Sequence, residues 1–94
     1  MATISIIIPC YNGWKYMENC LQSLEKQTIL PDEIIVMDDC STDDSFAQLS
    51  AYTATSVLPL RVLRNEKNSG PGFSREVASQ LVTSDYVAFC DCDN

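Results

Sequence analysis

Four short apolar runs, separated by longer segments with helical periodicity, constrain this chain more than any other feature. The runs are TISIIIP at 3–9, EIIVM at 33–37, LRVL at 60–63 and YVAFC at 86–90. The first two are too short for a helix and apolar at nearly every position, as in strands covered on both faces. Because the connections are longer than a hairpin allows, the runs predict a mostly parallel sheet.

The segments between the runs carry the helix signals. The expected buried faces are Trp14, Met17, Cys20, Leu21 and Leu24 in the first helix, Phe46 and Leu49 in the second, and Phe73, Val77, Ala78 and Leu81 in the third. Ser41 lies three residues before Asp44, an arrangement that can cap a helix, so we expect the second helix to start near Ser41. Alternating strands and helices predict an α/β fold with helices on both faces of the sheet.

The size of the chain limits it to one domain. A chain of 94 residues does not hold two independent cores. Its apolar share of 46% and charged share of 20% are ordinary for a globular protein and exclude a disordered or coiled-coil chain. The last run leads straight into residues 91–94 without a following helix, so we expect residues 1–94 to form one partial, truncated domain.

The charge is negative and uneven. A formal net charge of −7 without histidine disfavours nucleic acid as a partner, because binding a phosphate backbone needs a basic face. Residues 31–60 contain six carboxylates and no Lys or Arg, whereas four cations follow. These cations are Arg61, Arg64, Lys67 and Arg75. A divalent cation with a phosphate-bearing ligand would use both halves.

The cysteines indicate a reducing environment. Five cysteines without a leader peptide do not suggest a secreted disulfide framework, so we expect reduced thiols, mostly small buried side chains, and a cytoplasmic location. Cys90 and Cys92 are spaced C-x-C, and with no histidine available a zinc site would need thiolates from distant segments. No apolar run approaches the roughly 20 residues that span a bilayer, although membrane association of a longer parent protein stays open.

Polar side chains follow three of the four runs. They are Tyr11 and Asn12 after the first, Asp38 and Asp39 after the second, and Asp91 and Asp93 after the fourth. In an open parallel sheet, ligands bind beyond the carboxyl ends of the strands. Asp91 and Asp93 would lie on the same side of an extended backbone, where both can bind one hard cation such as Mg²⁺ or Mn²⁺.

Each of these groups also has a purely structural interpretation. Tyr11 can be a half-exposed aromatic residue, the 38–39 pair can begin a turn, and 91–93 can be a solvated loop. Asn68-x-Gly70 is also ordinary turn chemistry, and Arg75 on a helix is more often a surface charge. The interpretation as a binding site therefore depends on the combination.

The combination resembles a known family. SIIIPCYN at 5–12, QT-x-x-P-DEIIVMDDCSTDDS at 27–45, RNEKNSGPGFSRE at 64–76 and SDYVAFCDCDN at 84–94 are similar, in order and spacing, to the amino-terminal, nucleotide-binding half of family 2 glycosyltransferases. The similarity covers almost the whole chain. It implies a Rossmann-like GT-A nucleotide-binding half.

The resemblance also implies roles for single residues. Pro9, Tyr11 and Asn12 would hold the nucleotide base, with Tyr11 stacked on it, and Asp39 would accept a hydrogen bond from the imino group of the base. Asp38 would support the loop or the ribose. The remaining residues implied are Asn68 and Gly70 in the loop before the third helix, Arg75 near base or phosphates, Asp91 at ribose or metal, and Asp93 on the metal. Three positions depart from the family pattern, namely Glu76, Cys92 and Asn94.

The activity implied by the resemblance belongs to a longer parent protein. It is the transfer of a sugar from a nucleotide-diphosphate donor, most readily a UDP-sugar, to a hydroxyl of a saccharide or lipid-linked acceptor, as in polysaccharide biosynthesis. Mn²⁺ or Mg²⁺ would stabilise the leaving diphosphate, and the usual outcome is inversion. The general base and the acceptor site would lie beyond Asn94, so we expect these 94 residues to be inactive alone and to self-associate through an exposed sheet edge.

Two other classes are weighed against this one. A magnesium-binding, receiver-like signalling module also has acids at a strand end, as in IIVMDD, but it needs the acid pair after its first strand, where this chain has Pro-Cys-Tyr-Asn. A Rossmann dinucleotide-binding protein needs a G-x-G-x-x-G motif after the first strand, and this chain has none.

Overall fold

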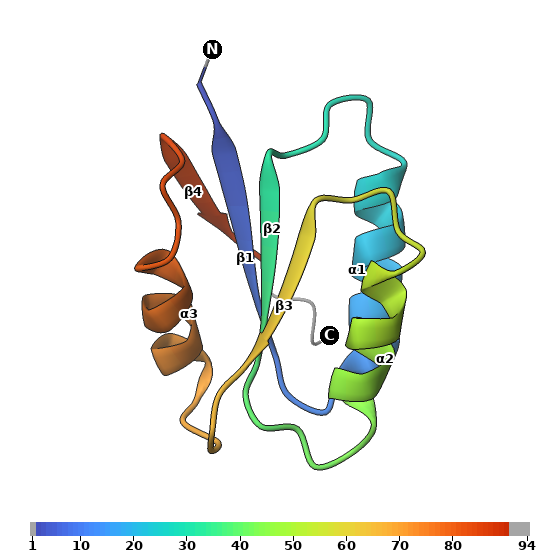
Figure 1. The fold of residues 1–94 in the computed structure, drawn as a ribbon, viewed down its shortest axis with the longest axis vertical. Coiled ribbons are helices and arrows are strands. Elements are labelled where there is room, and N and C mark those ends of the chain that lie inside the picture. The colour runs from blue at the N-terminus through green and yellow to red at the C-terminus, as the bar shows by residue number, and fades with distance from the viewer. Residues whose placement is uncertain (1, 91–94) are drawn as a thin grey trace.

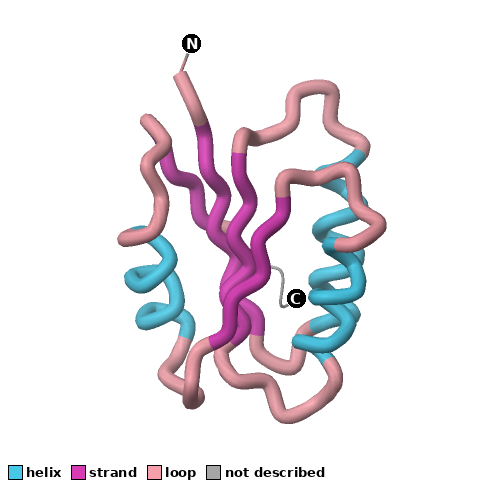
Figure 2. Tube along the Cα trace, in the orientation of Figure 1, coloured by secondary structure: helices cyan, strands magenta, loops and turns pink. Residues whose placement is uncertain are grey.

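A computed structural model of the chain describes residues 2–90. The elements are β1 (Ile4–Cys10), α1 (Trp14–Glu25), β2 (Glu33–Asp38), α2 (Ser45–Thr53), β3 (Leu60–Arg64), α3 (Pro71–Ser79) and β4 (Tyr86–Phe89). The strands are all parallel, in the order β3-β2-β1-β4. Helices α1 and α2 cover one face of the sheet and α3 covers the other (Figure 1; Figure 2). The predicted α/β fold, with a mostly parallel sheet between helices, is confirmed.

The two central strands bury side chains on both faces. Ile8, Ile34 and Val36 pack with α1 and α2, whereas Ile7 and Ile35 lie in a second core beneath α3. Successive side chains of a strand point to opposite faces, so a strand covered twice is apolar at almost every position. This double burial explains the near-continuous apolar runs of the sequence.

Two of the helices differ from the sequence-based expectation. Helix α2 begins at Ser45 rather than near Ser41, because the Ser41 hydroxyl and N–H donate to Asp38 instead of capping a helix. On α3 the buried residues are Ser74 and Ala78. Phe73 and Leu81, expected in the core, are 47% and 44% exposed. The 74/78 side of this short helix faces the sheet, and Leu81 lies beyond the end of the helix at Ser79.

The cysteines have different environments. Cys10 is buried, and the Cys40 thiol lies 3.6 Å from the Glu66 carbonyl oxygen. Cys20 on α1 is disulfide-bonded, so the expectation of five reduced thiols is wrong at this position. Its sulfur also lies 3.8 Å from that of Cys90, a distance too long for a bond between these two. Among residues 2–90, no helix is both long enough and apolar enough to cross a bilayer.

The order of the strands defines a place for a ligand. The chain moves outward from β1 to β2 and β3 and then returns to the other side of β1 to form β4. In open parallel sheets such a reversal opens a crevice at the carboxyl ends of the strands. These ends meet at the lower end of the molecule in Figure 1, together with the loops that follow β1, β2 and β3.

Candidate functional site

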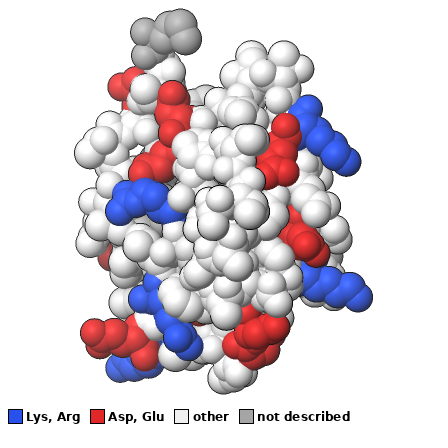
Figure 3. Space-filling view, turned by 45° about the vertical axis from the view of Figure 1, so that its right-hand side comes forward, with Lys and Arg blue, Asp and Glu red and all other residues white. Residues whose placement is uncertain are grey.

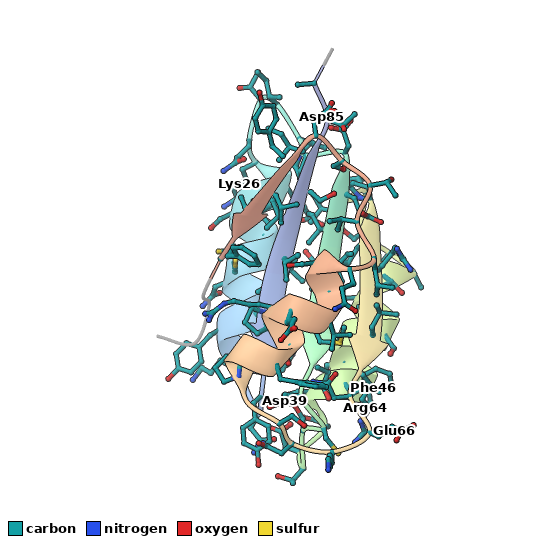
Figure 4. All side chains as sticks on the ribbon, turned by 90° about the vertical axis from the view of Figure 1, so that its left-hand side faces the viewer. Lys26, Asp39, Phe46, Arg64, Glu66 and Asp85 are labelled. Atoms are coloured by element: carbon teal, nitrogen blue, oxygen red, sulfur yellow. The ribbon has the colours of Figure 1, made fainter. Side chains whose placement is uncertain are left out.

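Asp39, the residue after β2, is the centre of the hydrogen bonds at this edge. The residue is 3% exposed. Oδ1 accepts hydrogen bonds from Asn65 Nδ2 at 2.8 Å and from the Ser69 N–H at 2.9 Å, and Oδ2 accepts one from the Gly70 N–H at 2.7 Å. The carboxylate therefore joins the end of β2 to the loop that leads into α3, near the lower end of Figure 4.

These contacts change the acidity of Asp39. Burial raises the pKa of the carboxyl group, but the hydrogen bonds from Asn65, Ser69 and Gly70 together outweigh burial and hold the pKa below its ordinary value of 3.8. Hydrogen bonds to a carboxylate favour its charged form. Asp39 is therefore an ionised acceptor at neutral pH.

Asp38 is used within the protein. It has no exposed surface, and its oxygens accept hydrogen bonds from the Ser41 hydroxyl at 2.5 Å and the Ser41 N–H at 2.9 Å. Arg64 Nε lies 3.6 Å from Asp38 Oδ2, and the guanidinium lies 5.1 Å above the Phe46 ring. In the described structure Asp38 thus supports the loop between β2 and α2, one of its two expected roles.

The turn after β1 is hydrogen-bonded to the loop between β2 and α2. Asn12 has a positive φ of 49°, and its Oδ1 accepts a hydrogen bond of 2.8 Å from the Thr42 N–H. Its own N–H donates to the Ser41 hydroxyl at 3.0 Å. The Asp39 N–H donates to the Cys10 carbonyl at 2.8 Å, which places Asp39 beside the start of this turn. Tyr11, in the turn, is 46% exposed.

The other predicted residues fall in three groups. Pro9 is partly buried in β1, and Arg75 is partly buried on α3. Asn68 is exposed in the loop before α3, where Gly70 has a φ of 93° that favours glycine. Asp91 and Asp93 lie outside the described residues. Within residues 2–90, no group of three or more His, Cys, Asp or Glu side chains is placed to hold a metal ion.

Sequence reasoning missed the residues whose hydrogen bonds hold the site residues in position. Ser41 binds Asp38 and Asn12, and Asn65 binds Asp39 and Ser74. A clue was available for Asn65, because it follows β3 at the same carboxyl edge as the predicted residues. No sequence signal connected Ser74 to it.

Charged side chains of both signs lie close together at this end of the molecule, as the lower part of Figure 3 shows. Asp39, Arg64 and Glu66 are labelled there in Figure 4. A shallow cavity of about 290 Å³ opens beside them and is lined by residues that include Arg64, Lys67 and Phe73. The edge thus offers both a fixed anion and cationic groups.

A parallel sheet between helices, with two acids at the carboxyl end of β2, defines an α/β domain of the class in which ligands bind at this edge. Residues 5–94 match the family described as glycosyl transferase family 2. The chain belongs to this family, as the sequence resemblance implied. The receiver-like alternative is not favoured.

Individual relatives support the assignment to this family. The poly(ribitol-phosphate) beta-N-acetylglucosaminyltransferase TarS of Staphylococcus aureus is 39% identical over 97 residues, which cover the whole of this chain and 17% of TarS. A crystal structure of S. aureus TarS 1–349 in complex with UDP-GlcNAc has a TM-score of 0.85 and 40% identity, and covers 97% of this chain and 26% of that one.

A second solved structure is more distant. It is the glucosyl-3-phosphoglycerate synthase of Mycobacterium tuberculosis in complex with Mn²⁺, uridine diphosphate and glucosyl-3-phosphoglycerate, with 27% identity and a TM-score of 0.77. It covers 97% of this chain and 33% of that one. The chain therefore spans between a sixth and a third of the length of these relatives.

Proposed function

We propose that the chain is the donor-binding part of a metal-dependent glycosyltransferase and that its carboxyl edge binds a nucleoside diphosphate sugar. The observation that carries the proposal is the Asp39 carboxylate, ionised and fixed in place at the crevice of the sheet. A carboxylate only accepts hydrogen bonds, so it selects a base that presents an N–H group, as uracil does.

The Asp39 carboxylate keeps capacity for a ligand. A carboxylate has about four lone-pair sites, and three hydrogen bonds from the described residues reach Asp39. The remaining site is the one that the proposal assigns to the imino group of the base. Tyr11, exposed in the neighbouring turn, offers a ring on which the base can stack, and Pro9 and Asn12 shape that turn.

The diphosphate and its metal ion are assigned to the side of the crevice opposite the base. We propose that Asp91 and Asp93 hold Mn²⁺ or Mg²⁺ through carboxylate oxygens, the ligands these hard cations prefer. Two observations support this: β4, which leads to these residues, lies parallel to β1, and a relative was solved with Mn²⁺ and uridine diphosphate. The bound cation would supply Lewis acidity to the departing diphosphate. Asn68, Gly70 and Arg75 are assigned to the base and phosphates.

The reaction that follows is transfer of the sugar to an acceptor hydroxyl of a saccharide or lipid-linked acceptor, with inversion. The S. aureus relative, named as a transferase that acts on poly(ribitol-phosphate), supports an acceptor of cell-surface polymer type. The proposal assigns the general base and the acceptor site to the parent protein outside this chain. The proposed location is the cytoplasm, where nucleotide sugars serve as donors, with membrane association left to the parent.

A panel of nucleotides tests the proposal. Calorimetric titrations of the chain with UDP, GDP, TDP and CDP, each with and without Mn²⁺, should give saturable binding that needs the metal and favours UDP. Asp39→Ala should lose about 1 to 3 kcal/mol of UDP affinity, the usual value of a hydrogen bond to a charged group. Equal affinity of the wild type for all four nucleotides would contradict the site assignment.

A separate proposal concerns the edge strand. All four residues of β4 are exposed, and the strand pairs with β1 alone among the described strands. We propose that the chain self-associates through this edge, because an unpaired strand is a template for pairing. Val87→Lys on β4 should reduce the association seen by sedimentation velocity, whereas Val57→Lys, in an exposed loop, should not. A stable wild-type monomer at high concentration would contradict the proposal.

A further inference from the structure

Asn65, the residue after β3, connects three segments of the chain. The residue is 8% exposed. Nδ2 donates one hydrogen bond of 2.8 Å to Asp39 Oδ1 and another of 2.8 Å to the Ser74 hydroxyl on α3. The backbone N–H of Asn65 donates to the Asp38 carbonyl at 2.8 Å. An amide NH₂ group has two protons, and both have acceptors here, on two different elements.

We propose that Asn65 is a positioning residue that sets the orientation of the Asp39 carboxylate and thereby its selectivity for the nucleotide base. The inference rests on the proposed function, in which Asp39 contacts the base and Asn65 acts only through Asp39.

The geometry singles out Asn65 among the three donors to Asp39. The other two, the N–H groups of Ser69 and Gly70, belong to adjacent residues of one loop and would move together with it. Asn65 is at the other end of that loop, directly after β3, and is anchored by its backbone to β2 and by its side chain to Ser74, which has no exposed surface. Asn65 is therefore the donor that ties the carboxylate to the rigid part of the fold.

The orientation of the carboxylate matters for the choice of base. Uracil presents an N–H at the position where cytosine presents an unprotonated ring nitrogen, so a fixed carboxylate attracts the first and repels the second. A carboxylate that can turn away discriminates less. Removing Asn65 should therefore lower the ratio of UDP affinity to CDP affinity, whereas a merely structural loss would weaken both ligands by the same factor.

The test is a calorimetric comparison of UDP and CDP, with Mn²⁺, on the full chain and four variants: Asn65→Ala, Ser74→Ala, Asp39→Ala and the control Asn19→Ala. Asn19 is exposed on α1 and gives the same chemical change far from the proposed site. We expect Asn65→Ala to lower the UDP-to-CDP ratio about tenfold, the fold-change of one charge-assisted hydrogen bond. Ser74→Ala should lower it less, and Asn19→Ala should leave it unchanged.

The possible outcomes distinguish a failure of this inference from a failure of the proposed nucleotide-binding function. If Asn65→Ala keeps the wild-type ratio of UDP affinity to CDP affinity while Asp39→Ala binds both nucleotides equally, the role of Asn65 is overturned and the proposed nucleotide site is retained. A wild type that does not discriminate UDP from CDP would overturn both. If circular dichroism shows that Asn65→Ala is unfolded, Ser74→Ala decides: an unchanged ratio there overturns the inference, and a lowered one supports it.

Discussion

Arg64 and Asp38 join the ends of β3 and β2 directly beneath the site, with Arg64 Nε 3.6 Å from Asp38 Oδ2. The guanidinium also donates to the Ser41 carbonyl at 3.2 Å and lies over the ring of Phe46. A single side chain from β3 thus holds both the beginning and the end of the loop between β2 and α2. Since Asp39 is part of this loop, the position of the candidate site depends on the Arg64 contacts.

Replacing Arg64 should therefore be costly. Arg64→Ala removes the cation that faces a fully buried carboxylate, and we expect a loss of about 1 to 3 kcal/mol in the free energy of unfolding. The Ser41 hydrogen bonds to Asp38 remain and limit the loss. Urea unfolding followed by circular dichroism measures it.

Arg61 is the matched control. It lies on the same strand and pairs with Glu33 at 3.0 Å, but Glu33 is in contact with solvent, at 25% exposure, whereas the side chain of Asp38 is fully buried. An exposed ion pair contributes about 0 to 1 kcal/mol, so Arg61→Ala should change stability little. Equal losses in the two variants would show that the buried Asp38 does not depend on Arg64.

Asn12 allows a test of backbone strain. Its φ of 49° lies in the left-handed region, which is unfavourable for residues with a Cβ other than Asn and Asp. Asn12→Ala and Asn12→Gly both lose the side-chain contacts to Thr42, but only alanine is strained at this φ. We expect the glycine variant to be more stable than the alanine variant by about 1 kcal/mol, measured by thermal unfolding. A less stable glycine variant would be inconsistent with this turn.

The contacts of Asp39 should appear in the pH dependence of stability. Because its folded-state pKa is lowered from 3.8, the carboxylate stabilises the fold above pH 3.8, and this contribution is lost as the pH falls through the folded-state pKa. Asp39→Asn should therefore be less stable than the wild type at pH 7, and the difference should shrink below pH 3.8.

Urea unfolding of both proteins from pH 7 to pH 3 measures that difference. The pKa of Asp43 is also lowered, by hydrogen bonds from the side chain and backbone of Ser45, but this contribution is common to both proteins and cancels. A difference that stays constant over the whole range would refute the role given to the three donors.

The strands were the most predictable part of the molecule. β1 and β2 lie between two layers of helix, so most of their side chains are buried and the sequence shows them as nearly continuous apolar runs. The same pattern predicted the parallel sheet, and with it the approach of Asp39 to the turn that contains Asn12. The family resemblance added the proposed roles of the site residues, which periodicity alone does not provide.

The side-chain network was not predictable in the same way. Asn65 and Asp39 are 26 positions apart, and their contact depends on how two loops fold over the edge of the sheet. On α3, the apolar Phe73 suggested the wrong buried side, because the buried position at Ser74 is polar and satisfied by Asn65. Buried polar groups that satisfy one another leave no periodic signal in a sequence.

The paramagnetism of Mn²⁺ offers the most direct test of where the ligand binds. In amide spectra of the chain titrated with Mn²⁺ and UDP, broadening should be strongest for residues at the carboxyl ends of the strands, such as Asn12, Cys40 and Gly70. Signals at the opposite edge, such as Asp32 and Asp85, should remain sharp. Broadening centred on that opposite edge, or spread evenly over the molecule, would contradict the proposed site.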